Sequence, residues 1–264
     1  MRTRFDYDRQ AETYDATRAA SPSVSGLLLA ALENLPGRRV LDIGGGTGNY
    51  SAALASVGFD PVVADYNADM LVRAATKGLA TVRADAAELP FPAASVDAAM
   101  FVSMLHHVPA WEQALEDGQR VVRPGGKVVL LAFGREHLAV HWVTSYLPRT
   151  TAHFAGSHQT MTELQGVLAG ATVTPVRYTD LVDGSMAAMC RQPETLLDPE
   201  IRRQTSFFEH ATTHEPDELR AGMTRLEADL AAGRRPQDED PDRRARLGDA
   251  ALFVWTADPD DRAF

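Results

Sequence analysis

A glycine-rich loop directly after a short apolar segment constrains the fold of this chain more than any other feature. The segment RRVLDIG at 38–44 is apolar and bounded by turn residues, which predicts a buried strand. A helix is expected from Asn49 to Val57. Between them lie the loop glycines Gly44, Gly45, Gly46 and Gly48. A strand, a glycine loop and a helix in this order let the backbone approach a ligand closely.

The same order of strand and helix continues to residue 133. Helices are expected at Pro22–Leu35, Asp69–Lys77 and Trp111–Val122. Four further strands are predicted in the segments FDPVVADY (59–66), LATVRADA (79–86), SVDAAMFVSM (95–104) and KVVLLAF (127–133). Alternation of this kind predicts a parallel sheet with helices on both faces, and such sheets bind ligands beyond the carboxyl ends of their strands.

The alternation breaks after Phe133. A helix is expected at Arg135–Leu147, then a polar stretch to His158, and a mostly helical region from Val182 to about Ala232. The segment GRRPQDEDPDRR at 233–244 predicts an exposed loop, and ALFVWTA at 251–257 predicts a last strand. The expected organisation is an N-terminal lid with helices (1–36), a ligand-binding core (37–133), a helical cap (134–158 and 182–249) and the remainder of the core sheet (159–181 and 250–257).

Composition limits the classes of partner. The formal net charge is -10 and the sequence pI is about 5.2, which argues against nucleic acid because phosphate backbones attract basic faces. Cys190 is the one cysteine, so neither an internal disulfide nor a zinc motif is predicted. The apolar run GLLLAAL at 26–32 is too short to span a membrane, and the N-terminus has no signal core. A cytoplasmic protein that binds neither membrane nor metal is expected.

The loop distinguishes between possible ligands. A phosphate-binding loop of the Walker type requires a lysine that is missing here, and the dinucleotide fingerprint requires a third glycine where Asn49 stands. Asp42 precedes the loop and disfavours a pyrophosphate, whereas a carboxylate suits a cationic cofactor. Asp65 ends the second strand, where a carboxylate accepts hydrogen bonds from ribose hydroxyls. A cationic cofactor with an adenosine group is favoured, and a dinucleotide is not excluded.

Five segments in this order and spacing resemble the class I S-adenosylmethionine-dependent methyltransferases of the bacterial small-molecule type. They are VLDIGGGTGNY, VVADYNADML, VRADAAELPF, DAAMFVSMLHHV and RVVRPGGKVVLLAF, between about Val40 and Phe133. The resemblance implies a doubly wound, Rossmann-like α/β sheet of seven strands, the last antiparallel, with helical cap insertions. It also implies S-adenosylmethionine as cofactor and methylation of an oxygen, nitrogen or carbon atom of a small molecule, such as a secondary metabolite.

The resemblance further implies roles for residues of the cofactor site. Tyr14 and Arg18 would close over the methionine end of the cofactor, and Asp42 with the loop glycines would face it. Asp65 would bind the ribose. The adenine would be flanked by Tyr66 and Met70 and bordered at its edge by Asp85 and Ala86. Val102 and Ser103 would lie near the cofactor at the end of the fourth strand.

Candidates for chemistry and for acceptor binding follow that strand. His106 and His107 are candidate general bases, because methylation of a hydroxyl requires removal of its proton. His137 and His141 have a spacing compatible with metal binding, but an amphipathic helix face is favoured. The expected wall of the acceptor pocket is Trp142, Tyr146, Met186 and Phe207. Histidines at 153, 158, 210 and 214 could also line it.

Two other functions stay open at this stage. One is a reaction other than methylation, such as cyclisation or decarboxylation, in the same cofactor site. The other is a nucleic-acid methyltransferase, which the acidic total disfavours. A monomer and a homodimer are both compatible with the sequence.

Overall fold

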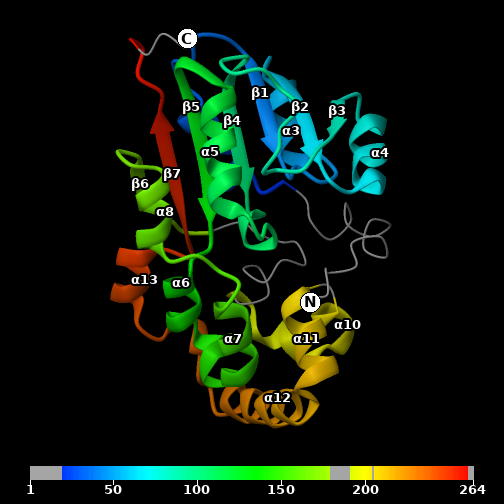
Figure 1. The fold of residues 1–264 in the computed structure, drawn as a ribbon. Coiled ribbons are helices and arrows are strands. Elements are labelled where there is room, and N and C mark those ends of the chain that lie inside the picture. Colours follow the sequence, from blue (N-terminus) through cyan, green and yellow to red (C-terminus); the bar gives the residue numbers. More distant parts are fainter. Residues whose placement is uncertain (1–19, 179–190, 204, 261–264) are drawn as a thin grey trace.

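A seven-stranded sheet forms the centre of the molecule (Figure 1). The computed structural model of the chain describes residues 20–178, 191–203 and 205–260. The strands lie in the order β3-β2-β1-β4-β5-β7-β6. Their bounds are β1 Arg39–Ile43, β2 Asp60–Asp65, β3 Ala80–Arg83, β4 Val96–Val102, β5 Val122–Ala132, β6 Thr172–Val176 and β7 Ala250–Thr256. The first five strands pair in parallel and β7 runs antiparallel to both β5 and β6, which confirms the predicted fold class.

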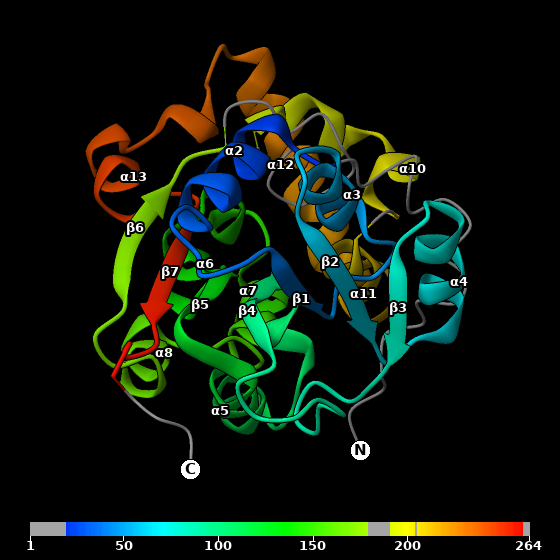
Figure 2. The ribbon, with the colours of Figure 1, turned by 90° about the horizontal axis from the view of Figure 1, so that it is seen from above.

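Helices cover both faces of the sheet (Figure 2). On one face lie α2 (Pro22–Ala31) and α3 (Asn49–Ser56), on the other α5 (Trp111–Val121) and α8 (Met161–Val167), and α4 (Ala68–Thr76) packs beside β2 and β3. Buried side chains of the sheet and the helices fill both layers, among them Leu28, Leu54 and Met100 on the first face and Phe101, Leu115 and Phe253 on the second. No helix among the described residues is long and apolar enough to cross a membrane.

A second group of helices lies beyond the carboxyl ends of the parallel strands, and we call it the helical cap (Figure 1). Its elements are α6 (Arg135–Val140), η2 (Trp142–Ser145), α7 (Pro148–Ala155), η3 (Pro193–Leu197), α10 (Pro199–Arg202), α11 (Ser206–His214), α12 (Pro216–Ala231), η4 (Pro236–Asp238) and α13 (Pro241–Leu247). The cap has its own apolar core, which includes Val143, Leu147, Phe208 and Leu226. It is therefore packed around a core separate from the two layers of the sheet.

A buried carboxylate joins two helices of the cap. Glu218 of α12 accepts hydrogen bonds from the backbone N–H of Arg149 (2.6 Å) and from the backbone N–H and hydroxyl of Thr150 (3.0 and 2.8 Å) in α7. Gly222 allows α12 to approach the segment that precedes α7, because a Cβ there would lie 2.6 Å from the carbonyl oxygen of Tyr146. These contacts fix the first turn of α7, whose N–H groups have no partner within the helix.

Three segments differ from the sequence-based expectation. The helix expected at Arg135–Leu147 is interrupted at His141, whose backbone is extended (φ -68°, ψ 134°). The polar stretch before His158 contains α7, and the expected loop at 233–244 contains η4 and the start of α13. The helices α7, η4 and α13 each begin with a proline, which is favourable at the first helical position. β5 also includes the segment RPGG at 123–126, where its pairing with β4 shifts in register.

Candidate functional site

The glycine loop turns sharply between β1 and α3. The backbone N–H of Gly44 donates to the carbonyl of Ala64 at 2.7 Å, which ties the loop to the end of β2. Gly44, Gly46 and Gly48 have φ values of +66°, +56° and +73°, a region that residues with a Cβ rarely adopt. Gly48 is the N-cap of α3, so the loop ends where this helix begins.

The surroundings of these glycines differ from one to the next. A Cβ at Gly45 would lie 2.5 Å from the carboxyl carbon of Asp42, and one at Gly48 would lie 2.5 Å from Leu79. A Cβ at Gly44 would collide with Met104. A Cβ at Gly46 would meet no atom of the described residues within 4 Å. The loop is therefore packed against the protein on one side, and at Gly46 its backbone borders a space that no described residue fills.

Asp42 lies beneath this loop, with only 2% of its surface exposed. Its Oδ2 accepts a hydrogen bond from the hydroxyl of Ser51 at 2.6 Å, whereas its Oδ1 accepts none within the described part of the chain. Burial raises the pKa of Asp42 to about 7, the Ser51 hydrogen bond counteracts part of that rise, and the charge of Asp65 adds to it. A buried acceptor without a partner is costly. It suits a ligand that brings a cationic or hydrogen-bond-donating group.

Asp65 connects the glycine loop to the loop that follows β2. At the end of β2, its Oδ2 accepts the N–H of Gly46 at 2.9 Å and its Oδ1 accepts the N–H of Asn67 at 2.8 Å. Asn67 in turn caps α4 through the N–H groups of Asp69 and Met70. A carboxylate offers about four acceptor positions, and it can accept hydrogen bonds from hydroxyl groups as well as from amides. The place and chemistry of Asp65 fit the predicted contact with a ribose.

The residues expected around the adenine occupy different environments. Tyr66 follows β2 with 48% of its surface exposed, and the Arg83 guanidinium lies 5.4 Å from its ring centroid. Met70 is buried on α4. Asp85 is exposed and its Oδ1 accepts the N–H of Ala87 at 3.0 Å, while Ala86 is half-buried. Tyr66 and Asp85 thus follow β2 and β3 at the carboxyl edge, and their contacts with a cofactor stay predictions.

The end of β4 carries the next group of predicted residues. Val102 is the last residue of β4, and Ser103 follows with a φ of +54°, unusual for a residue other than glycine. The N–H of Ser103 donates to Leu131 at 3.0 Å. His106 and His107 lie in η1 (Leu105–His107), with ring centroids 3.9 Å apart. The candidate bases therefore lie within one turn of the β4 edge.

The predicted acceptor wall is brought together in part. Trp142 is half-buried, and its ring meets the ring of Tyr146 edge-on at 5.7 Å. Tyr146 donates its hydroxyl hydrogen to Asp229 at 2.7 Å, and both Tyr146 and Phe207 belong to the apolar core of the cap. Their role in acceptor binding stays a prediction. Tyr14, Arg18 and Met186 lie outside the described residues.

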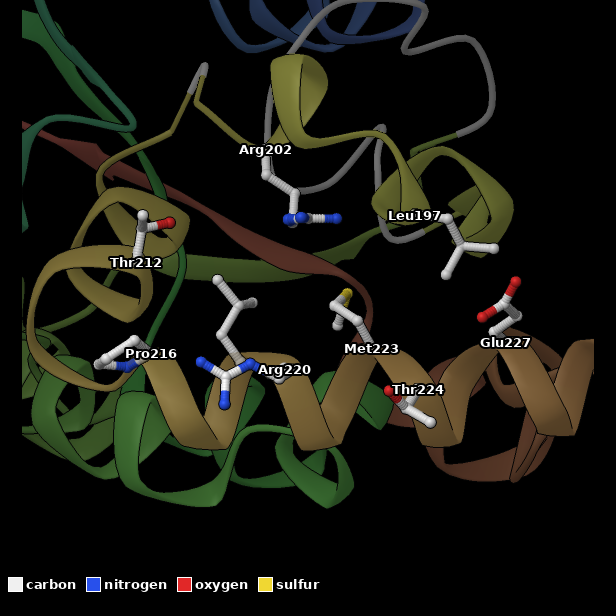
Figure 3. A pocket seen from close by; sticks show the side chains of 9 residues that line it. Leu197, Arg202, Thr212, Pro216, Arg220, Met223, Thr224 and Glu227 are labelled. Atoms are coloured by element: carbon white, nitrogen blue, oxygen red, sulfur yellow. The ribbon is translucent and has the colours of Figure 1, made fainter.

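A cavity of about 370 Å³ opens between η3, α10, α11 and α12 (Figure 3). Arg202 points into it toward α12, and Arg220 and Glu227 line its α12 side (Figure 3). Its other lining residues are Leu197, Thr212, Pro216, Leu219, Met223 and Thr224. The sequence analysis missed this cavity. Six of its lining residues are spaced three and four residues apart along α12, but this spacing does not distinguish a cavity wall from a surface.

All eight histidines of the chain take part in ring contacts, several of them within the cap. His158 stacks on His106 with centroids 4.6 Å apart and an interplanar angle of 9°. Desolvation lowers the pKa of His137 and of His158, and it lowers that of His141 to about 4. No group of three or more histidine, cysteine or carboxylate side chains among the described residues is arranged to hold a metal ion.

Comparisons with known proteins bear on this edge of the sheet. Residues 41–130 match the family model described as a methyltransferase domain. The chain is 40% identical over 107 residues to a demethylmenaquinone methyltransferase of Beutenbergia cavernae, covering 40% of this chain and 45% of that protein. It is also 40% identical over 111 residues to a ubiquinone/menaquinone biosynthesis C-methyltransferase of Ectopseudomonas mendocina, covering 38% and 43%. The matched region thus spans less than half the length of these curated relatives.

A solved structure extends the likeness in fold to nearly the whole chain. It is a methyltransferase assigned to an antibiotic biosynthesis pathway of Anabaena variabilis, with a TM-score of 0.73 and 24% identity over 91% of this chain and 98% of that one. Residues 41–130 are thus similar to a methyltransferase domain, and the chain has the fold of that solved methyltransferase.

Proposed function

We propose that this chain transfers the methyl group of S-adenosylmethionine to an oxygen, nitrogen or carbon atom of a small molecule. The observation that carries the proposal is the chemistry of the glycine loop. Asp42 presents a buried oxygen that accepts no hydrogen bond from the described residues, and Gly46 in the same loop borders a space that none of them fills. A cofactor that carries an amino group and a sulfonium fits an acidic edge of this kind.

Each residue of the edge has a distinct task in the proposal. Asp42 accepts a hydrogen bond from the amino-acid part of the cofactor, and Asp65 accepts hydrogen bonds from its ribose. Because Gly46 has no side chain, it leaves room for the cofactor at a position where any other residue would project one. When bound, the cofactor supplies an electrophilic methyl group, and the protein contributes alignment of the acceptor and exclusion of water.

A small acceptor is favoured by the position of the cap. The cap lies beyond the carboxyl ends of the parallel strands, where ligands of such sheets bind (Figure 1). The cap has an apolar core, and its cavity presents hydroxyl and guanidinium groups. The names of the relatives suggest quinols as a first class of acceptor to assay. The matched region ends at residue 130, before the cap begins, so the cap itself carries no such indication.

The test is product analysis with a matched pair of variants. The purified chain is incubated with S-adenosylmethionine and a panel of naphthoquinols, phenols and amines, and both products are followed by mass spectrometry. We expect S-adenosylhomocysteine together with a methylated acceptor. Asp65→Ala should lose the reaction. Asp60→Ala removes an exposed carboxylate at the opposite end of β2 and should keep it. An acceptor converted without S-adenosylhomocysteine would favour cyclisation or decarboxylation and contradict the proposal.

A further inference from the structure

The hydrogen bonds of three histidines near the junction of core and cap fix the position of the ring proton in each. Nδ1 of His137 accepts the N–H of Gly134 at 3.0 Å, and its Nε2 lies 3.3 Å from the carbonyl oxygen of Leu247. Nδ1 of His141 accepts the N–H of Val143 at 3.1 Å. A neutral imidazole has one acceptor and one donor nitrogen. In both residues the acceptor nitrogen is already used by the backbone, so neither offers a basic nitrogen.

His158 has the opposite arrangement. Its Nδ1 lies 2.7 Å from the carbonyl oxygen of Phe154, and because a carbonyl only accepts, Nδ1 must carry the proton. The lone pair of the neutral ring is then on Nε2, and no described residue donates a hydrogen bond to it. Only 7% of the residue surface is exposed. Of these three imidazoles, His158 is therefore the one that presents a basic nitrogen.

The surroundings of His158 favour its neutral form. Desolvation lowers its pKa, the hydrogen bond to Phe154 offsets part of that shift, and the Arg135 guanidinium, which donates to the His158 carbonyl oxygen at 3.1 Å, lowers the pKa further. The ring of Phe133 meets it edge-on at 5.9 Å. The carboxylates on the neighbouring helices are bound elsewhere: Glu136 accepts the N–H of Met161, and Glu163 accepts the N–H of Thr160. Neither is placed to stabilise an imidazolium at His158.

His158 contacts the carboxyl edge of the sheet through its stacking partner, His106. His106 lies in η1, three residues after Ser103 and directly beyond β4. His158 lies between α7 and α8, where the chain returns from the cap to the sheet. The 4.6 Å stack thus joins the β4 edge to the base of the cap. A small acceptor held between core and cap would meet this pair.

We propose that His158 is the proton acceptor for methyl transfer, with His106 as the positioning residue that holds its ring. The proposal rests on the proposed function. The bond from the acceptor atom to the methyl carbon forms as the methyl–sulfur bond breaks, and that electron pair stays on sulfur. The acceptor's proton passes to Nε2 of His158 and later to water. Nδ1 keeps its proton throughout through its bond to Phe154.

Imidazole NMR tests the required ring state without any acceptor. Long-range ¹H–¹⁵N spectra of the full chain, labelled in histidine, are assigned by comparison with His158→Asn. At neutral pH we expect His158 neutral with its proton on Nδ1, and His137 and His141 neutral with the proton on Nε2. A His158 that carries its proton on Nε2, or that is charged at neutral pH, would overturn the proposal.

Kinetics with an acceptor from the panel tests the role itself. His158→Asn should lower kcat by about 10²- to 10⁴-fold, the usual contribution of a general base. Its affinity for S-adenosylhomocysteine should be unchanged. The matched control is Asp217→Asn, a change to asparagine at an exposed position of the cap, which should keep the wild-type rate. The wild-type rate should also persist as the pH falls through about 6.5, where an ordinary histidine becomes charged.

Two results would overturn the role of His158: an unchanged kcat in His158→Asn, or a loss of rate that merely follows a loss of cofactor affinity. The failure of the proposed function has a different signature. In that case the wild-type chain itself methylates no acceptor, whatever the state of the histidine ring.

Discussion

The substitution Gly46→Ala separates the conformational role of the loop from its role in binding. Gly46 has a φ of +56°, and a Cβ there would meet no atom of the described residues within 4 Å. The change should therefore cost only the strain of a left-handed alanine, about 1–2 kcal/mol. For a chain of this size that corresponds to a fall in Tm of roughly 2–8 °C. The new methyl group would project into the space assigned to the cofactor, so the affinity for S-adenosylhomocysteine should fall at least about tenfold, or 1.4 kcal/mol.

Gly78→Ala is the matched control for this change. Gly78 has a φ of +78° and a Cβ position that is also open, but it follows α4 and precedes the amino end of β3. Thermal unfolding should show a similar loss of stability in both variants. Isothermal titration should show weaker binding in Gly46→Ala alone. Equal loss of stability with unchanged binding in Gly46→Ala would refute the assignment of that space to the cofactor.

Three further predictions concern buried carboxylates and the cap. Because burial raises the pKa of Asp42 to about 7, the folded chain holds that proton more tightly than the unfolded chain. Its contribution to the free energy of unfolding should fall between about pH 4 and pH 7, and Asp42→Asn should flatten that fall in urea titrations of the ligand-free chain. Glu218→Ala should cost roughly 1–3 kcal/mol in the same assay, since it leaves three donors of α7 unpaired, whereas exposed Asp217→Ala should be near neutral. Trp142→Ala should change acceptor turnover while the affinity for the cofactor stays within about twofold, or roughly 0.4 kcal/mol.

The sequence predicted the features that depend on short-range patterns. The strands around the glycine loop are short apolar segments bounded by turn residues, and Asp65 stands at the end of one of them. The last strand, at Ala250–Thr256, is apolar enough to be recognised by itself. Its antiparallel orientation came from the resemblance, and its place between β5 and β6 was not predicted, because pairing depends on contacts far apart along the chain.

Other features depend on tertiary contacts that no local pattern records. The break at His141 accompanies a hydrogen bond from the N–H of Val143 to its ring, and the sequence there is otherwise compatible with a helix. The proton positions of His137 and His158 follow from the carbonyls and amides that happen to lie beside each ring. Apolar residues such as Phe207 are equally suited to a pocket wall or a core, and the structure places this one in the core of the cap.

The most direct test of the central claim is a titration of S-adenosylhomocysteine into the wild-type chain and its two Asp variants. We expect saturable binding to the wild type and to Asp60→Ala, with binding at least about tenfold weaker, or 1.4 kcal/mol, in Asp65→Ala. NAD should give no comparable heat. Two results would contradict the assignment of this edge of the sheet to the methyl-donor cofactor. One is tighter binding of NAD than of S-adenosylhomocysteine, and the other is an affinity for S-adenosylhomocysteine that is the same in Asp65→Ala as in the wild type.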